Sequence, residues 1–175
     1  MDGGNLVLVV GSYADAGAAN DDFGALKAGQ DAGEYKVVGA VVMNRDASGK
    51  VDVKEHGDKR VAADSIIGGT AGLVVGLFAP PLLAATAVGA GLGAVWGYLS
   101  KRHAEKELGV DVEEYLPAGS SAVVAVVDDT YADKVEAALV KSDKRINKAI
   151  DSGDYEDLQN AIAKSTDQVA DAITA

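Results

Sequence analysis

The chain has no cysteine, only two histidines and few aromatic residues, and each shortage removes a class of function. Without cysteine, its 175 residues hold no disulfide, no thiol nucleophile and no cysteine-ligated zinc or iron–sulfur site. His56 and His103 are the only imidazoles, too few for most histidine-based metal sites. Aromatic residues make up 5% of the sequence and Gly numbers 21, so the interior must be built from Val, Ala, Leu, Ile and bare backbone.

Basic residues are also in short supply. There are 16 of them against 27 acidic residues, which gives a formal net charge of -11. Because the phosphate backbone would be repelled, we expect no nucleic-acid partner. The N-terminus is acidic where a secretory signal would be basic, and the apolar run Leu6–Val10 is short enough to be a strand. We therefore expect the protein to lie on the cytoplasmic side of the inner membrane or to form a cytoplasmic assembly.

Four apolar runs predict an antiparallel sheet. Two of them lead into similar segments, Ser12-Tyr13-Ala14-Asp15 and Thr130-Tyr131-Ala132-Asp133, which resemble hydroxyl-capped helix starts. The first helix is expected to run to about Ala32. We predict an α+β fold: a two-layer, ferredoxin-like βαββαβ sheet with helices on one face, an inserted glycine-rich helical hairpin and C-terminal helices. The predicted strands are Leu6–Val10, Val37–Met43, Val51–His56 and Ala122–Val127.

The predicted organisation has three parts. Residues 1–60 and 117–150 form the α/β sandwich, residues 61–116 the apolar hairpin with a connecting helix, and residues 151–175 a C-terminal amphipathic helix. From Thr130 onward the chain is predicted to be helical. Two apolar stripes repeat with the spacing 4, 7, 4, and they favour a helical hairpin that packs on itself or on a second subunit. Alternatively, the last helix covers the sheet of its own chain. The stripes are Val135, Leu139, Ile146 and Ile150, and Leu158, Ile162, Val169 and Ile173.

The centre of the chain lacks charge. Ser65–Leu99 contains no Asp, Glu, Lys or Arg, and Pro80-Pro81 divides it into two predicted helices. Glycine recurs every four residues in each helix, although Gly inside a helix costs roughly 1 kcal/mol relative to Ala. Close approach of two helix backbones would offset that cost. The recurring glycines are Gly68, Gly72 and Gly76, then Gly89, Gly93 and Gly97.

Length alone does not decide whether this hairpin enters a membrane. The two arms would span about 22 and 27 Å, against a hydrocarbon core of about 30 Å. Basic residues flank both ends and none lies at the proline tip, the pattern of a hairpin with both ends on the cytoplasmic side. Burial in a protein assembly is the alternative. The flanking basic residues are Lys59, Arg60, Lys101, Arg102 and His103, and the interfacial aromatics are Trp96 and Tyr98.

Three stretches carry a resemblance to a known family. They are Leu6–Gly11, the charge-free Ile66–Tyr98, and Leu116-Pro117-Ala118-Gly119-Ser120-Ser121-Ala122-Val123. Over roughly Leu6–Leu139 they resemble an uncharacterised bacterial family, domain of unknown function twelve sixty-nine. The resemblance implies a βαββ unit, a glycine-rich hairpin and a closing strand, together with membrane association and no recognised enzyme activity. It supplies no site residues, and the helix from Tyr155 onward lies outside it.

Candidate chemistry in the sequence is sparse. Gly89–Ala94 matches the dinucleotide pattern G-x-G-x-x-A but lies inside a predicted Ala/Gly helix rather than after a strand. His103 and Glu107, four residues apart, indicate a surface ion pair. Adjacent acids have a plainer interpretation as solvated or helix-start residues. They are Asp21-Asp22, Glu113-Glu114 and Asp128-Asp129.

The sequence therefore predicts a non-enzymatic structural protein with no cofactor and no metal. We expect it to form a homo-oligomer and to associate with lipid through the glycine-rich hairpin. One alternative is a soluble filament or shell protein whose hairpin is a subunit interface. Another is a small-molecule or nucleotide binder that uses a cavity between sheet and hairpin.

Overall fold

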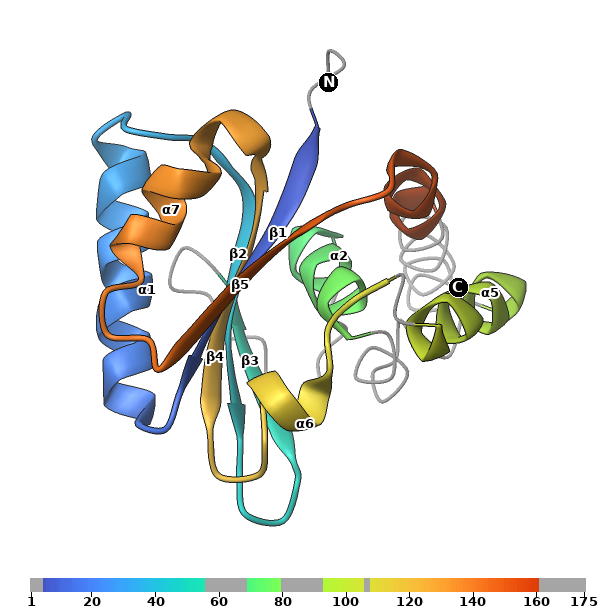
Figure 1. The fold of residues 1–175 in the computed structure, drawn as a ribbon, viewed down its shortest axis with the longest axis horizontal. Coiled ribbons are helices and arrows are strands. Elements are labelled where there is room, and N and C mark those ends of the chain that lie inside the picture. The colour runs from blue at the N-terminus through green and yellow to red at the C-terminus, as the bar shows by residue number, and fades with distance from the viewer. Residues whose placement is uncertain (1–4, 56–68, 80–92, 106–107, 161–175) are drawn as a thin grey trace, which may run out of the picture.

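A computed structural model describes residues 5–55, 69–79, 93–105 and 108–160. They form a mixed α+β fold around one five-stranded sheet (Figure 1). The strands are β1 (Leu6–Tyr13), β2 (Val37–Arg45), β3 (Val51–Glu55), β4 (Ser121–Asp128) and β5 (Lys144–Ala149). The helices are α1 (Ala16–Asp31), α2 (Gly69–Phe78), α5 (Gly93–Ala104), α6 (Val112–Tyr115), the short 3₁₀ turn η1 (Asp129–Tyr131) and α7 (Ala132–Ala138), and residues 152–160 are also helical.

All neighbouring strands in the sheet are antiparallel, in the order β3-β2-β4-β1-β5. β4 lies between β1 and β2, the two strands that α1 connects. In the same way, β1 lies between β4 and β5, which η1 and α7 connect. The predicted α+β class with an antiparallel sheet is confirmed.

Helices cover both faces of the sheet, which corrects the prediction of two layers with helices on one face. α1 and α7 lie on one face, and α2 lies on the other, with α5 and residues 152–160 on that same side (Figure 1). The reason is that both faces are apolar: Val7 and Val9 pack toward the α1 side, while Leu8 and Val10 pack toward α2. A strand that is apolar on both faces must be covered on both.

β5 overturns the prediction that the chain is helical from Thr130 to Ile150. Residues 144–149 form an edge strand that pairs with β1, and Ile146 lies opposite Val10. A spacing of four residues, as between Ile146 and Ile150, keeps two side chains on one face of a helix and also on one face of a strand. The periodicity therefore could not separate the two structures, and the open edge of β1 selected the strand.

Carboxylates, and not hydroxyls, cap the two helical segments that follow β1 and β4. Asp15 precedes α1 and accepts a hydrogen bond from the Gly17 backbone N–H at 2.9 Å. Asp128 precedes η1 and accepts one from the Thr130 N–H at 2.9 Å, which lowers the pKa of Asp128. Ser12, the predicted hydroxyl cap, lies within β1 because that strand continues to Tyr13.

Candidate functional site

A cleft with a volume of about 680 Å³ lies where α5, the segment 108–111, α6 and β5 meet. Its size is typical of small-molecule sites. The apolar part of its lining includes Leu108 and Val110, both buried, and the half-buried Ile146 and Tyr115. The lining also contains both charge signs, so the cleft is amphipathic. The charged or ionisable lining residues are His103, Lys148, Asp111 and Glu114.

Two cation-forming side chains bond to consecutive carbonyl groups in this lining. His103 Nδ1 lies 3.1 Å from the Leu108 carbonyl oxygen, and Lys148 Nζ donates to the Gly109 carbonyl oxygen at 2.8 Å. Because a carbonyl oxygen only accepts, the His103 contact requires a hydrogen on Nδ1. Residues from α5 and from β5, far apart in sequence, thus bring their polar ends to two successive peptide groups.

The loop that carries this peptide is fixed by a glycine and by the end of α2. Gly109 has a φ of +79°, and a Cβ there would come within 2.5 Å of the Phe78 carbonyl oxygen. That same oxygen accepts a hydrogen bond from the Val110 N–H at 2.9 Å. Only glycine permits both the left-handed backbone and this close approach.

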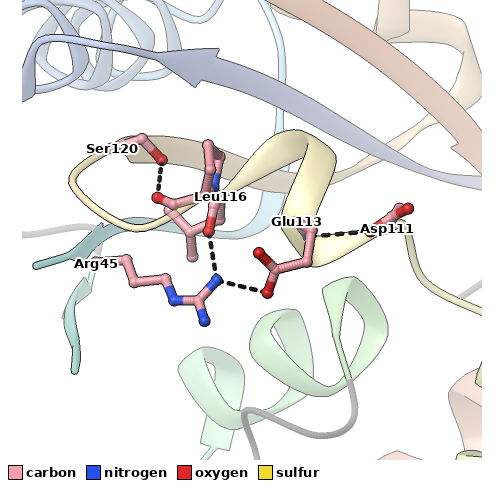
Figure 2. A network of polar contacts seen from close by, with 6 residues as sticks. Arg45, Asp111, Glu113, Leu116 and Ser120 are labelled. Atoms are coloured by element: carbon pink, nitrogen blue, oxygen red, sulfur yellow. Dashed lines mark hydrogen bonds and ion pairs between the residues drawn. The ribbon is translucent and has the colours of Figure 1, made fainter. Parts of the chain in front are cut away.

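Arg45 fixes the α6 side of the cleft. Its Nη1 donates to the Leu116 carbonyl oxygen at 3.0 Å and to Glu113 Oε1 at 3.1 Å (Figure 2). Figure 2 also shows Asp111 at the start of α6, where its side chain accepts the Glu113 N–H at 3.0 Å. Since Arg45 ends β2, these bonds tie α6 to the sheet.

One acidic residue, Glu114, and one aromatic residue, Tyr115, complete the α6 side of the cleft. Glu114 lies 3.9 Å from Lys144 Nζ on β5. Burial and, secondarily, the charge of Glu114 raise the pKa of the neighbouring Tyr115. At neutral pH the Tyr115 hydroxyl therefore keeps its proton and is a neutral donor in the lining.

The stretch Leu116–Ser121, which carries part of the family resemblance, forms a turn that leads into β4. The Ser120 hydroxyl donates to the Pro117 carbonyl oxygen at 2.6 Å (Figure 2), and the Ser120 N–H donates to the same oxygen at 3.1 Å. Gly119 has a φ of +82°, and its N–H donates to the Arg45 carbonyl oxygen at 2.8 Å. The motif therefore has a structural role in positioning β4 beside β2.

A buried polar cluster lies on the α1 side of the sheet, away from the cleft. Asp22 Oδ2 accepts the Tyr13 hydroxyl at 2.7 Å and the Lys141 N–H at 2.8 Å. Lys141 Nζ pairs with Asp21 at 2.8 Å. The sequence offered Asp21-Asp22 as an acid pair, and the structure uses both residues to hold the α7–β5 loop on α1.

The predicted packing residues differ in burial, and several of them lie outside the described residues. Gly76 is buried in α2, and Leu158, in the helical residues 152–160, is fully buried in the α2-side core of its own chain. Gly97 on α5 is exposed, with no atom within 4 Å of a Cβ built there. Gly72 lies in α2, and Gly93 and Trp96 in α5. Gly68, Pro80, Pro81, Gly89, Ile162, Val169 and Ile173 lie outside the described residues, as do His56 and Glu107.

Sequence reasoning missed Lys148 and Arg45 as site residues. Lys148 was assigned to a helix, so nothing placed it beside His103. Arg45 lies beyond the predicted strand Val37–Met43, whereas β2 extends to it. The residues of β5, Lys-Arg-Ile-Asn-Lys-Ala, do not alternate between polar and apolar, so the sequence contained no local signal for this strand.

Within the described part of the chain, no group of three or more His, Asp or Glu residues is placed to hold a metal ion. Among the helices of the described ranges, none combines the length and apolar character needed to cross a membrane.

Comparison with known proteins gives one family. The model of a protein family of unknown function, DUF1269, matches residues 65–163, which is more than half of the chain. The match begins at the charge-free segment rather than at Leu6, and it includes β5 and the helical residues 152–160. No curated protein and no solved structure matches the chain. The chain belongs to the DUF1269 family.

Proposed function

We propose that this chain is a non-enzymatic structural protein that self-assembles into a homo-oligomer and contacts lipid through its glycine-rich segment. The supporting observation is Gly97, which is exposed in α5 and has open space where a side chain would lie. Glycine costs a helix roughly 1 kcal/mol relative to Ala. Gly97 belongs to the four-residue glycine repeat Gly89, Gly93 and Gly97, whereas the equally exposed Gly24 of α1 belongs to no such repeat, and a second copy packed on α5 would use the space beside it.

α2 limits how much of the charge-free segment contacts lipid. Residues 74–79 are all buried, and Val74, Val75, Leu77 and Phe78 belong to the core against β1, β2 and β4. Burial of one such side chain contributes about 1.5–3 kcal/mol. Withdrawing α2 into a bilayer would expose the sheet, so we assign the lipid contact to the part of the segment after Ala79. Lys101, the exposed basic residue in the last turn of α5, would lie at the lipid surface.

Of the adjacent acids in the sequence, Asp22 holds the loop before β5 and Asp128 caps a helical turn. We interpret β1, β2, β4 and β5 as a ferredoxin-like core into which β3 and a glycine-rich hairpin are inserted. We expect the protein to lie on the cytoplasmic side of the inner membrane.

The test combines a mass measurement with vesicle flotation. Light scattering on the purified chain should give a multiple of the 17.8 kDa subunit mass. The chain should float with phosphatidylglycerol vesicles. Flotation failure with an intact oligomer would favour the soluble filament or shell protein, and a monomer would refute self-assembly.

Gly97→Leu and Gly24→Leu form a matched pair for the interface. Both glycines are exposed in helices, and neither has an atom within 4 Å of a built Cβ. We expect Gly97→Leu to lower the oligomer mass while Gly24→Leu, on α1, leaves it unchanged. Equal masses for both variants would show that the α5 face is not the interface.

A further inference from the structure

We propose that β3 of one chain pairs with β3 of a second copy, antiparallel and about a twofold axis at Val53, so that two sheets join edge to edge. This inference rests on the self-assembly proposed above and names one contact of the oligomer. The sheet ends at β3 on one side and at β5 on the other. The outer edge of such a strand presents backbone N–H and C=O groups with which another chain can pair.

At alternate residues, the backbone groups of β3 point away from β2. The hairpin between the two strands closes where the Asp46 N–H donates to the Lys50 carbonyl oxygen at 2.9 Å. Hydrogen-bonded and non-hydrogen-bonded pairs alternate in an antiparallel ladder, so the pair Met43–Val53 is non-hydrogen-bonded, and so is the pair that contains Val51. The N–H and C=O groups of Val51 and Val53 therefore face the open edge. Within the described residues, β2 is the only strand that pairs with β3.

Charge makes this edge complementary to itself in one register. When Val53 lies opposite Val53 of the second copy, Asp52 lies opposite Lys54 of that copy, and the twofold axis repeats the pair. Opposite charges in directly facing positions stabilise two antiparallel strands. Asp52 is exposed in the single chain, so a second copy can reach it. In the same register Val53 and its counterpart form a hydrogen-bonded pair, because the N–H and C=O groups of both face the shared edge.

The apolar residues of β3 support the same contact. Val53 is buried in the α2-side core, and Val51 is half-buried against that core. Because side chains alternate along a strand, Asp52 lies on the opposite face of the sheet. Pairing would therefore bring the Val53 side chains of the two copies together on the α2 side, so the apolar layer beneath α2 would meet its counterpart in the second copy.

The other edge of the sheet does not suit this contact. β5 contains three cations and no acidic residue, so two β5 strands would bring like charges together. It also offers no acid to face Lys54. Pairing of β3 with β5 would be head-to-tail, and such a contact continues into an open filament, whereas a contact between two β3 strands closes on itself.

Disulfide trapping tests the register. The chain has no cysteine, so only introduced thiols can form a disulfide. Asp52→Cys and Lys54→Cys forms of the full chain are co-expressed and mildly oxidised. The Cα atoms of facing residues in a non-hydrogen-bonded pair are about 4.5 Å apart, a separation that a disulfide can bridge. We therefore expect a disulfide between the two different chains, identified by mass spectrometry.

Two controls establish that the disulfide reports this register. In Asp52→Cys alone, position 52 would be diagonal to position 52 of the second copy, about 7–8 Å away, so little disulfide should form. Asp52→Cys co-expressed with Asn147→Cys probes head-to-tail pairing, since Asn147 is exposed on β5. A disulfide between positions 52 and 147, or one between two copies of position 52 that is as abundant as the 52–54 disulfide, would overturn the proposal.

Charge reversal tests the same pair without cysteine. Asp52→Lys places a lysine opposite Lys54 of the second copy, so it should lower the oligomer mass measured by light scattering. Adding Lys54→Asp to the same chain restores opposite charges and should restore the mass. A cooperative melting curve for each variant shows that the chain still folds. An unchanged mass for Asp52→Lys, or no recovery in the double variant, would contradict the β3 contact.

The outcomes separate this contact from self-assembly as a whole. If the parent chain is an oligomer but no 52–54 disulfide forms, the β3 contact is refuted and self-assembly stands. If the parent chain is a monomer, self-assembly is refuted, and the β3 contact with it. The 52–54 disulfide together with recovery of the mass in the double variant would support both.

Discussion

At the scale of single residues, Gly109 shows how one backbone position joins three parts of the molecule. Its left-handed φ turns the chain after α5, and its carbonyl oxygen accepts the Lys148 ammonium from β5. The absence of a Cβ lets the Phe78 carbonyl oxygen approach from α2. A side chain at position 109 would therefore disturb both the cleft and the packing of α2 on the sheet.

Gly109→Ala and Gly119→Ala separate backbone strain from steric conflict. Both glycines have φ near +80°, but only Gly109 has a backbone atom within 3 Å of a built Cβ. We expect Gly119→Ala to lower the free energy of unfolding by about 1–2 kcal/mol, the cost of a left-handed alanine. Gly109→Ala should cost at least about 1 kcal/mol more. Urea unfolding measures both, and equal losses would contradict the close approach at Phe78.

Tyr13 predicts an alkaline limit to stability. Burial first, and then its hydrogen bond to Asp22, raise the pKa of Tyr13 above the ordinary value of 10.0. A pKa raised on folding contributes stability that is fully present below pH 10 and is lost as the pH rises through the folded-state pKa. The free energy of unfolding should therefore fall above pH 10 by at most about 1.4 kcal/mol per pH unit from this group.

Tyr13→Phe isolates this contribution. Urea unfolding at pH 8, 10 and 11 should show a smaller alkaline loss for Tyr13→Phe than for the parent chain. Tyr131→Phe, on η1, controls for the removal of a tyrosine hydroxyl at another position. If the parent and Tyr13→Phe lost stability in parallel, the buried Tyr13–Asp22 pair would not account for the alkaline limit.

At the scale of elements, β5 is the segment whose structure depends most on its neighbour. Its six residues include three cations and only one large apolar residue, Ile146, so it has little to bury by itself. The cations on this edge discourage pairing with a further strand. β5 forms because β1 presents unpaired backbone groups along Val7–Ser12, and the register places Ile146 over the core.

A pair of Ala→Thr variants tests whether residues 144–149 form a strand. Ala149 on β5 and Ala137 on α7 are both exposed. Thr is favoured in strands and disfavoured in helices. We expect Ala149→Thr to raise the free energy of unfolding by a few tenths of a kcal/mol and Ala137→Thr to lower it by about 0.5 kcal/mol. If both variants lowered the stability in thermal unfolding, the result would support the helix that the sequence predicts for residues 144–149.

At the scale of the whole molecule, the sheet is an apolar layer between two helical layers. Two core clusters lie on its opposite faces, one beneath α1 and α7 and the other beneath α2. The α2-side cluster also contains Leu108, Leu116 and Leu158. The segments that form the cleft are thus anchored in the same core as α2.

Phe78→Ala tests this dependence. Phe78 is fully buried against the sheet, so its truncation should lower the free energy of unfolding by about 3–5 kcal/mol. Val140→Ala, at a position that is 73% exposed, should stay within about 0.5 kcal/mol of the parent. Urea unfolding monitored by circular dichroism measures both. If Phe78→Ala changed the free energy of unfolding only slightly, α2 would not be packed on the sheet in solution.

Most strands could be predicted because their residues are apolar on both faces. The runs at Leu6–Val10 and Ala122–Val127 have no alternative to burial in a sheet, and the structure lengthens each by a few residues. The helix of α1 was also predictable from its apolar positions. The cleft was not predictable, since it requires β5 beside the end of α5, and the spacing of Ile146 and Ile150 fits helix and strand equally.

The sequence by itself determined the α+β class, the family and the strands of the sheet's interior, because these depend on local runs of apolar residues and on motifs within single segments. Only the tertiary structure decided that α2 covers the second face, that residues 144–149 pair with β1, and that His103 and Lys148 bond to the successive carbonyl groups of Leu108 and Gly109. Each of these depends on which exposed edge or apolar face another segment leaves open, and a linear pattern contains no such information.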